Sequence, residues 1–205
     1  MAMLANYRCS VHRIPPRTSV CLTRRDGPLL LLTLGGGVHE EVSGRSLSFQ
    51  HELSAHWEPF STPEVILKST TEEGHVYAVQ VTSPVDTLHS AVAFGADPAV
   101  STDVGTKLLF QNGLVRVWAF EVAPGFSCHI HQHVLDYFFL NMEVSDTLGL
   151  DREGQLKGNV ARQTSGQLTF VSVSGPPYPI HGLVNVGSNT FQQFVVEFKA
   201  RLSKL

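Results

Sequence analysis

Four histidines have the residue type and the spacing that metal ligation requires. Three of them, His129, His131 and His133, occupy alternate positions in the segment FSCHIHQHVLDYFFLN, residues 126–141. Successive side chains of an extended strand point to opposite faces, so these three imidazoles would share one face. The fourth, His181, follows a proline-rich turn. Two strand histidines joined by a third from a distant strand are a common way to hold a divalent metal ion.

The elements that must position these histidines are predicted to be strands. Short runs rich in Val, Leu, Phe and Tyr recur between clusters of Gly, Pro, Asn and Ser, which is the pattern of an all-β sandwich or barrel. Residues 106–111 and 114–122 flank Asn112-Gly113 and predict a β-hairpin, because both turn residues tolerate positive φ.

The first part of the chain matches the histidine-bearing part in pattern. A gapless alignment pairs Thr23 with His131 and, extended backward, Ile14 with Val122. The apolar run at residues 29–34 then meets 137–142. Few letters are identical, so the match is one of strand pattern.

A second gapless block pairs residues 59–64 with 176–181, which places Glu64 on His181. The two blocks together indicate one strand-rich unit used twice. We therefore predict two domains, residues 1–98 and 99–205, with a linker near residues 83–105.

The histidine segments resemble the two motifs of the cupin superfamily. Its first motif is Gly, five residues, His-x-His, then Glu after three or four residues; Gly125 precedes His131 and His133 at that spacing. Its second motif is a proline-rich approach followed by His, three residues and Asn, which His181 and Asn185 fit. The resemblance implies tandem cupin or jelly-roll barrels (double-stranded β-helices) and implies His131, His133 and His181 as the metal ligands.

The glutamate of the first motif is missing, and Asp136-Tyr137 stands near its position. In this detail the chain resembles small cupins associated with β-alanine breakdown. By strand parity Tyr137 shares the face of His133, whereas Asp136 points away unless the chain bulges. Three residues remain candidates for a further role: Asp136 as a fourth ligand, an exposed turn acid or an acceptor that orients a ligand histidine; Tyr137 as a catalytic group or packed aromatic; and His129 as a cavity residue or strand cap. Asn185 is expected to tie down backbone near the site.

The first half lacks the ligand residues. Thr23, Arg25 and Glu64 occupy the three ligand positions, and Leu29 occupies that of Tyr137. An arginine cannot ligate a cation and leucine has no donor atom. We expect a degenerate first barrel without a metal and with a structural role.

Composition narrows the function classes. Hydrophobic residues make up 42% of the 205 residues and charged residues 16%, which excludes a disordered chain. The net charge is -3 with no dense basic run, so we expect no nucleic-acid partner. No apolar run approaches the roughly 18–20 residues of a membrane span. Residues 35–37, Gly-Gly-Gly, lack the context of a phosphate loop, and no residue is assigned to an organic cofactor.

The compartment is predicted from cysteines and from the N-terminal segment. Three cysteines without CxxC spacing indicate a reducing compartment, and we predict the cytoplasm. Five arginines and no acid in the first 25 residues raise an organelle transit peptide as an alternative. That alternative is disfavoured because the same segment takes part in the internal repeat.

Three functions follow from a three-histidine site for Fe, Ni, Zn, Mn or Cu. The first is an enzyme that acts on a small organic acid or thiol, dioxygenase-like because cupin thiol dioxygenases also use three histidines without a carboxylate. The second is a non-catalytic module that binds a metal or metabolite. A sugar isomerase or epimerase ranks last, since it needs an inward acid/base pair. The expected partner is a small molecule, with a homodimer as one oligomeric option.

Overall fold

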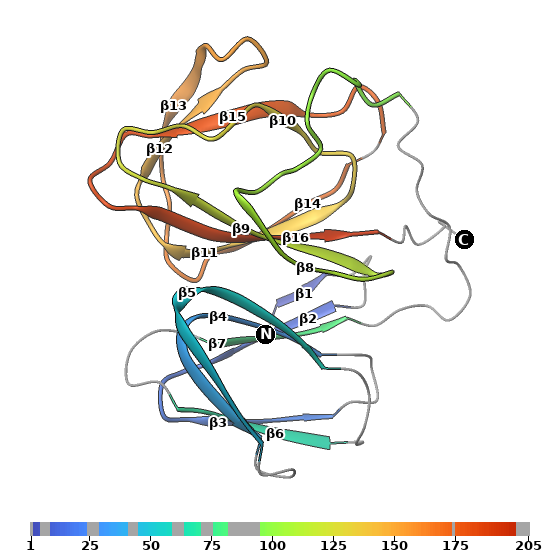
Figure 1. Ribbon diagram of the computed structural model, residues 1–205, viewed down its shortest axis with the longest axis vertical. Helices are drawn as coiled ribbons and strands as arrows, with labels where there is room; N and C mark the ends of the chain where they lie inside the picture. The colour runs from blue at the N-terminus through green and yellow to red at the C-terminus, as the bar shows by residue number, and fades with distance from the viewer. Residues whose placement is uncertain are drawn as a thin grey trace. The chain divides into compact units, whose positions relative to one another are not determined.

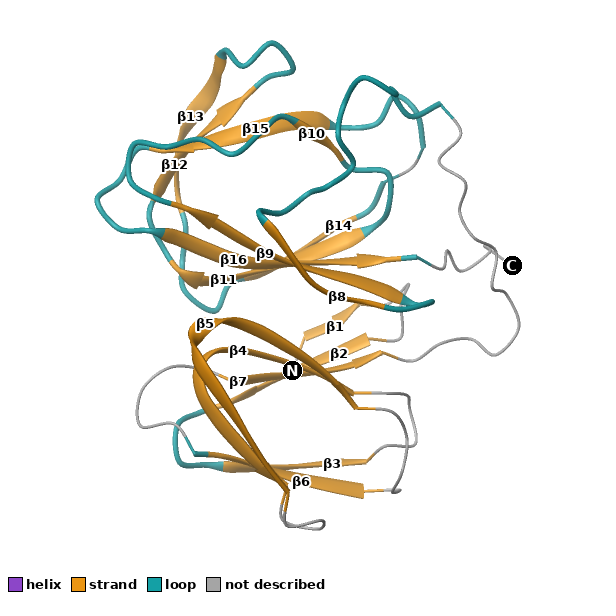
Figure 2. Cartoon of the chain, viewed as in Figure 1, coloured by secondary structure: helices purple, strands orange, loops and turns teal. Residues whose placement is uncertain are grey.

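The computed structural model describes residues 2–4, 9–23, 29–40, 45–58, 64–70, 76–81, 95–173 and 175–199. Every regular element in these ranges is a β-strand, as Figure 2 shows. The strands are β1 (Ala2–Leu4), β2 (Cys9–Ile14), β3 (Ser19–Thr23), β4 (Leu29–Glu40), β5 (Arg45–Glu58), β6 (Glu64–Ser69), β7 (Val76–Val81), β8 (Lys107–Gln111), β9 (Val115–Val122), β10 (His131–Gln132), β11 (Tyr137–Glu143), β12 (Asp146–Leu150), β13 (Leu156–Arg162), β14 (Leu168–Val171), β15 (Ile180–Asn185) and β16 (Phe191–Phe198). The predicted all-β class is confirmed. Within the described ranges no helix is long and apolar enough to cross a membrane.

The chain divides into two compact units, one holding residues up to Thr87 and the other Leu88–Arg201. The division falls earlier than the boundary after residue 98 that the sequence suggests, and most of the proposed linker lies outside the described residues.

The second unit is built from two antiparallel sheets. One has the strand order β10-β15-β12-β13 and the other β14-β11-β16-β9-β8. In Figure 1 these sheets face each other as the two layers of a barrel. Alternate side chains of β9 and β16 fill the interior with a buried cluster that includes Trp118, Phe120, Phe191 and Val195. This cluster forms the floor beneath the histidines.

The predicted hairpin is present as β8 and β9. Its turn is held by Asn112, whose side-chain Oδ1 accepts hydrogen bonds from the N–H groups of Leu114 and Val115 at 2.8 and 2.9 Å. The asparagine therefore stabilises the turn through its side chain, and Gly113 does not adopt positive φ.

The first unit contains one sheet of order β1-β2-β7-β4-β6-β3, with β5 added on β4. Its interior is an apolar cluster of buried leucine, valine, isoleucine and alanine side chains from β2, β3, β4, β6 and β7. Leu29, Leu31 and Val76 are each 0–1% exposed within it.

Strand register in the two units supports the internal repeat. Thr23 pairs with Glu64 across β3 and β6, as His131 pairs with His181 across β10 and β15. Only the backbones of Thr23 and Glu64 are described, and Arg25 lies outside the described residues.

The same agreement holds across the next pair of strands. Leu29 pairs with Gln80 across β4 and β7, as Tyr137 pairs with Glu197 across β11 and β16. The two aligned blocks therefore match residues that pair across neighbouring strands in both units, in addition to matching the strand pattern.

The backward extension of the alignment is wrong by two residues. Val76 pairs with Ile14, whereas its counterpart Gln193 pairs with Phe120, so Ile14 corresponds to Phe120 and not to Val122. The second unit has two more residues between this strand and its first ligand strand, in a loop that absorbs the difference. Because the shift is even, the inward and outward faces are unchanged.

Candidate metal centre

Two neighbouring strands bring the three predicted ligand side chains together. His131 on β10 is the direct register partner of His181 on β15, and paired residues of antiparallel strands project to the same face. His133 lies just beyond β10, where its N–H donates a hydrogen bond of 3.0 Å to the carbonyl of Pro179. These backbone pairings place all three histidines at the β10–β15 end of the four-stranded sheet.

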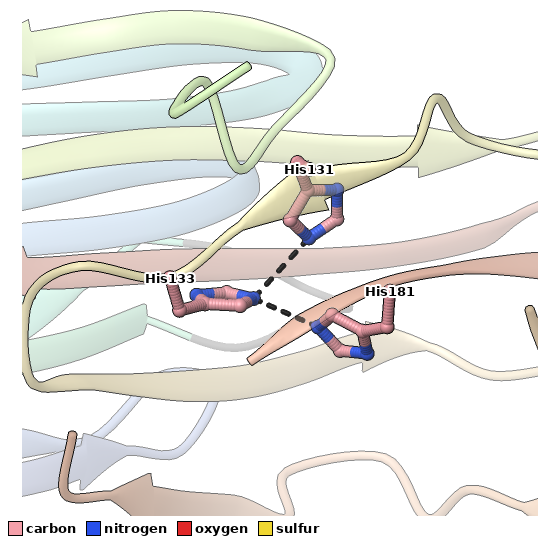
Figure 3. Close-up of side chains that lie close together, drawn as sticks. All are labelled: His131, His133 and His181. Atoms are coloured by element: carbon pink, nitrogen blue, oxygen red, sulfur yellow. Dashed lines mark hydrogen bonds between the residues drawn. The ribbon is translucent and has the colours of Figure 1, made fainter. Parts of the chain in front are cut away.

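The imidazole Nε2 atoms converge on one point. The Nε2 of His133 lies 3.2 Å from that of His131 and 2.9 Å from that of His181, as Figure 3 shows. One nitrogen from each ring lies within 4.8 Å of the others. Among the described residues, these three form the cluster that could hold a metal ion.

Two of the rings are held in this orientation by neighbours. The Nδ1–H of His131 donates a 3.0 Å hydrogen bond to the carbonyl of His129, which leaves Nε2 as the unprotonated nitrogen. Metal-binding histidines commonly use this arrangement to fix the ring and its tautomer. The ring of His133 stacks on Tyr137 with centroids 4.0 Å apart and an interplanar angle of 14°.

Burial keeps the cluster uncharged. Removal from water, together with the neighbouring imidazoles, lowers the pKa of His131 to about 4 and that of His133 to about 2. The pKa of His181 is also lowered, first by burial of its ring and then by the charge of Lys157, although the residue as a whole is exposed. Neutral imidazoles have a lone pair to donate, which is the form a metal ion requires.

The donor set fits a divalent transition metal. The Nε2 of His133 lies within hydrogen-bonding distance of the Nε2 atoms of both His131 and His181, and a single N–H can point directly at only one of them. The Nδ1 of His133 is buried without a partner among the described residues. Nitrogen-rich sites of this kind suit Fe, Ni, Cu, Zn or Mn. His131, His133 and His181 would hold the ion.

The three further candidates have different surroundings. Tyr137 is buried, and its ring faces the cluster as strand parity predicts. Burial and the charge of Glu197 raise the pKa of its hydroxyl to about 12. Asp136 points the other way, where its carboxylate accepts hydrogen bonds from the backbone N–H of Val173 and the hydroxyl of Ser172.

The side chain of His129 is exposed, and its Nε2–H donates to the carbonyl of Asp103 at 2.7 Å. Its contribution to the cluster is the carbonyl that orients His131. The sequence pattern finds His129 but not this backbone role.

A cavity of about 170 Å³ lies beside the imidazoles. The ligand strands form one wall, and β9, β11 and β16 of the other sheet contribute the opposite wall. The lining residues are Val104, Phe120, Cys128, His131, His133, Tyr137, Phe139, Gln163, His181, Gly182, Leu183, Phe191, Gln193 and Val195. None of these fourteen residues is Asp, Glu, Lys or Arg.

Solved structures with this architecture cover nearly the whole chain. A protein from Pseudomonas aeruginosa described as glyoxylate-induced shares 12% identity over 98% of this chain and 78% of its own, with a TM-score of 0.59. AerE from Microcystis aeruginosa shares 10% identity over 94% and 88%, with a TM-score of 0.58. A variant of the Bacillus subtilis oxalate decarboxylase shares 12% identity over 97% and 70%, with a TM-score of 0.50. The chain has the bicupin fold.

Sequence comparison identifies no related family or protein. No family model matches the chain, and no curated protein matches it. At 10–12% identity the structural likeness establishes the fold alone.

Two buried amides anchor the backbone of the second unit around the cluster. The side chain of Asn185 donates to the carbonyls of Val122 and Asn189 at 2.8 and 2.7 Å and accepts from the N–H of Gly187 at 3.0 Å. This is the backbone-fixing role expected for it. Gln132, between two ligand positions, was not singled out from the sequence; it is 1% exposed and makes three hydrogen bonds to the segment at 97–100.

A buried carboxylate was also missed. Glu197 on β16 is 0% exposed; its Oε2 accepts a 2.8 Å hydrogen bond from the indole N–H of Trp118 and lies 3.4 Å from Arg116. Its Oε1 has no partner among the described residues. Burial raises the pKa of this carboxyl, and the contacts with Trp118 and Arg116 oppose that rise. The sequence signal for this residue is a single acid in the strand FQQFVVEF, whose other side chains are apolar or amides.

Proposed function

We propose that this bicupin binds one divalent metal ion through His131, His133 and His181 and acts there on a small organic acid or thiol in the manner of a dioxygenase. The observation that carries the proposal is the convergence of three Nε2 atoms, with the ring of His131 oriented through its other nitrogen. When bound, the ion would supply Lewis-acid polarisation and open coordination positions for a chelating substrate.

The chain's own groups beside the cluster favour an enzyme over a closed structural metal site. No fourth protein ligand joins the three histidines among the described residues, so three ligands leave room for substrate. Tyr137 and Gln193 line the adjacent cavity, and a tyrosine hydroxyl and a glutamine amide are groups that can hydrogen-bond a bound molecule. Apolar side chains, among them Phe120, Leu183 and Phe191, line the cavity as well.

The second candidate is a non-catalytic module that binds a metal or metabolite. It is favoured by the lack of an acidic side chain among the described lining residues, since general acid/base catalysis by a carboxylate is then not available. The same feature counts against an isomerase or epimerase. We propose the cytoplasm as the compartment because a buried thiol such as Cys128 stays reduced there.

The metal site is tested by elemental analysis of freshly purified protein. Wild type should carry one equivalent of metal, and His131→Ala and His181→Ala should carry none while retaining the wild-type far-UV circular dichroism spectrum. His129→Ala is the matched control, because its exposed ring lies two residues from His131 and its backbone carbonyl survives the substitution. Full metal occupancy in His181→Ala, or none in wild type, would remove the site.

Catalysis is tested separately by oxygen uptake. Metal-loaded wild type should consume O₂ with at least one small acid or thiol, and His181→Ala should not. Ligand binding without O₂ consumption across such a panel would favour the binding module.

A further inference from the structure

The second unit buries an ionisable carboxylate whose hydrogen bonding is incomplete. Glu197 on β16 is 0% exposed, and its Oε2 accepts from the indole N–H of Trp118 at 2.8 Å and lies 3.4 Å from the guanidinium of Arg116. The other oxygen, Oε1, is buried without a partner among the described residues. Burial accordingly raises the pKa of this carboxyl. A buried charge with an unused acceptor is costly unless another interaction compensates for it.

The first unit has a neutral group at the same position. Gln80 on β7 is the counterpart of Glu197, since corresponding strand pairs include both residues. Gln80 is 6% exposed, and its Oε1 accepts a 3.0 Å hydrogen bond from the hydroxyl of Ser10. An uncharged amide of the same size therefore fits this backbone position. The amide stands in the unit whose sequence lacks the three ligand histidines, and the acid stands in the unit that has them.

Glu197 lies one aromatic side chain away from the histidine cluster. It is the register partner of Tyr137, whose ring stacks on that of His133 with centroids 4.0 Å apart. Glu197 is not one of the residues that line the cavity, so it is not placed to touch a molecule bound there. An influence on the cluster must therefore act through space. Charges attract over such a separation in a protein interior, where little water screens them.

The predicted ligands bring no negative charge to a divalent ion. The three imidazoles donate as neutral groups, and none of the described lining residues is acidic. A nearby buried carboxylate would stabilise the ion without contact, and the ion would in turn offset the cost of burying the carboxylate. Arg116 already balances part of that negative charge, which reduces the effect without removing it.

We propose that Glu197 is the counter-charge of the second barrel, which raises the affinity of the three-histidine site for a divalent cation without ligating it. This inference rests on the proposed function, because it needs a cation at His131, His133 and His181. The coupling is reciprocal, so the ion favours the ionised carboxylate as much as the carboxylate favours the ion. The carboxylate is therefore unfavourable in the metal-free barrel and favourable in the loaded one.

The test compares metal affinity with metal-free stability. Zn²⁺ affinity is measured by competition with a chromophoric chelator, and urea denaturation is measured on protein freed of metal. Glu197→Gln should weaken Zn²⁺ binding about 10-fold and, at the same time, raise the urea midpoint of the metal-free protein. Unchanged Zn²⁺ affinity, or a lower urea midpoint in the metal-free variant, would overturn the inference, because either result is what a purely structural carboxylate gives.

Further variants separate this buried charge from charge in general. Glu143→Gln removes an exposed acid from the same unit and should change Zn²⁺ affinity by less than about 2-fold, since water screens that charge. A loss as large as that of Glu197→Gln would refute a specific role. Glu197→Asp and Glu197→Asn match each other in size and differ in charge, and they decide the question if Glu197→Gln does not fold. The aspartate variant should bind Zn²⁺ about 10-fold more tightly than the asparagine variant, and equal affinities would overturn the inference.

The two levels of the proposal fail differently. Metal content is measured first, and wild type without metal refutes the proposed function. A wild type that binds Zn²⁺ at the three histidines no more tightly than Glu197→Gln leaves the metal site intact and refutes only the counter-charge.

Discussion

Gln132→Leu should destabilise the second barrel and weaken metal binding at the candidate site, although Gln132 is not one of the three proposed ligands. Its Nε2 donates to the carbonyls of Asp97 and Val100 at 2.6 and 2.8 Å, and its Oε1 accepts from the N–H of Asp97 at 3.0 Å. A net contribution of about 1 kcal/mol per hydrogen bond gives a loss of about 2–4 kcal/mol in the free energy of unfolding. For a chain of this size the melting temperature should fall by about 5–15 °C.

The effect on metal binding follows from the position of this anchor. Gln132 lies between His131 and His133, and its own N–H donates to the carbonyl of Ser101 at 2.8 Å, so the segment and β10 support each other. Loss of support behind a ligand typically costs 10–100-fold in metal affinity. We expect a decrease in this range, measured by competition with a chromophoric chelator.

The measurement combines urea denaturation with the chelator competition, on wild type, Gln132→Leu and Gln155→Leu. The last is the matched control because Gln155 is exposed. Wild-type stability and wild-type metal affinity in Gln132→Leu would refute the view that this side chain holds the ligand strand in place.

Four other substitutions probe different parts of the chain. Glu197→Gln should raise the free energy of unfolding of the metal-free protein at pH 7, because burial raises the pKa of the carboxyl in the folded state and so makes its ionised form destabilising above the unfolded pKa. In urea titrations the gain should vanish below about pH 4, where the carboxyl is protonated in both states, and a gain that persists there would contradict this reason. Asp136→Asn should keep one equivalent of metal by elemental analysis, because the carboxylate faces Val173 instead of the cluster. Arg25→Ala and Glu64→Ala should also keep the full metal content, and loss of metal from either would mean that the first barrel holds an ion.

The ligand cluster could be predicted because it depends on simple periodicities. Alternate positions on a strand place His131 and His133 on one face, and the resemblance to a two-motif family supplies His181 from a distant part of the chain. The same parity places Tyr137 beside the cluster and turns Asp136 away. These inferences needed only the side on which each residue lies.

The cavity and its supports could not be predicted in this way. Gln193 and Glu197 belong to a strand whose register with its neighbours fixes which side chains face inward, and register depends on pairings that single-sequence patterns do not specify. His129 acts through a backbone carbonyl, which every residue possesses. The two-residue error in aligning Ile14 arose because an even shift preserves the apolar pattern.

The matching pairs Thr23–Glu64 and His131–His181 make this chain a comparison of two chemistries on one backbone scaffold. The two units do not differ by a slip in strand register at these positions, because corresponding residues pair with each other in both. They differ in the residue types that stand there. A protein engineer could therefore transplant imidazoles into the first barrel and learn whether correct strand pairing plus donor atoms suffices to capture a metal ion. The second barrel, with its proposed metal site, would serve as the reference within the same molecule.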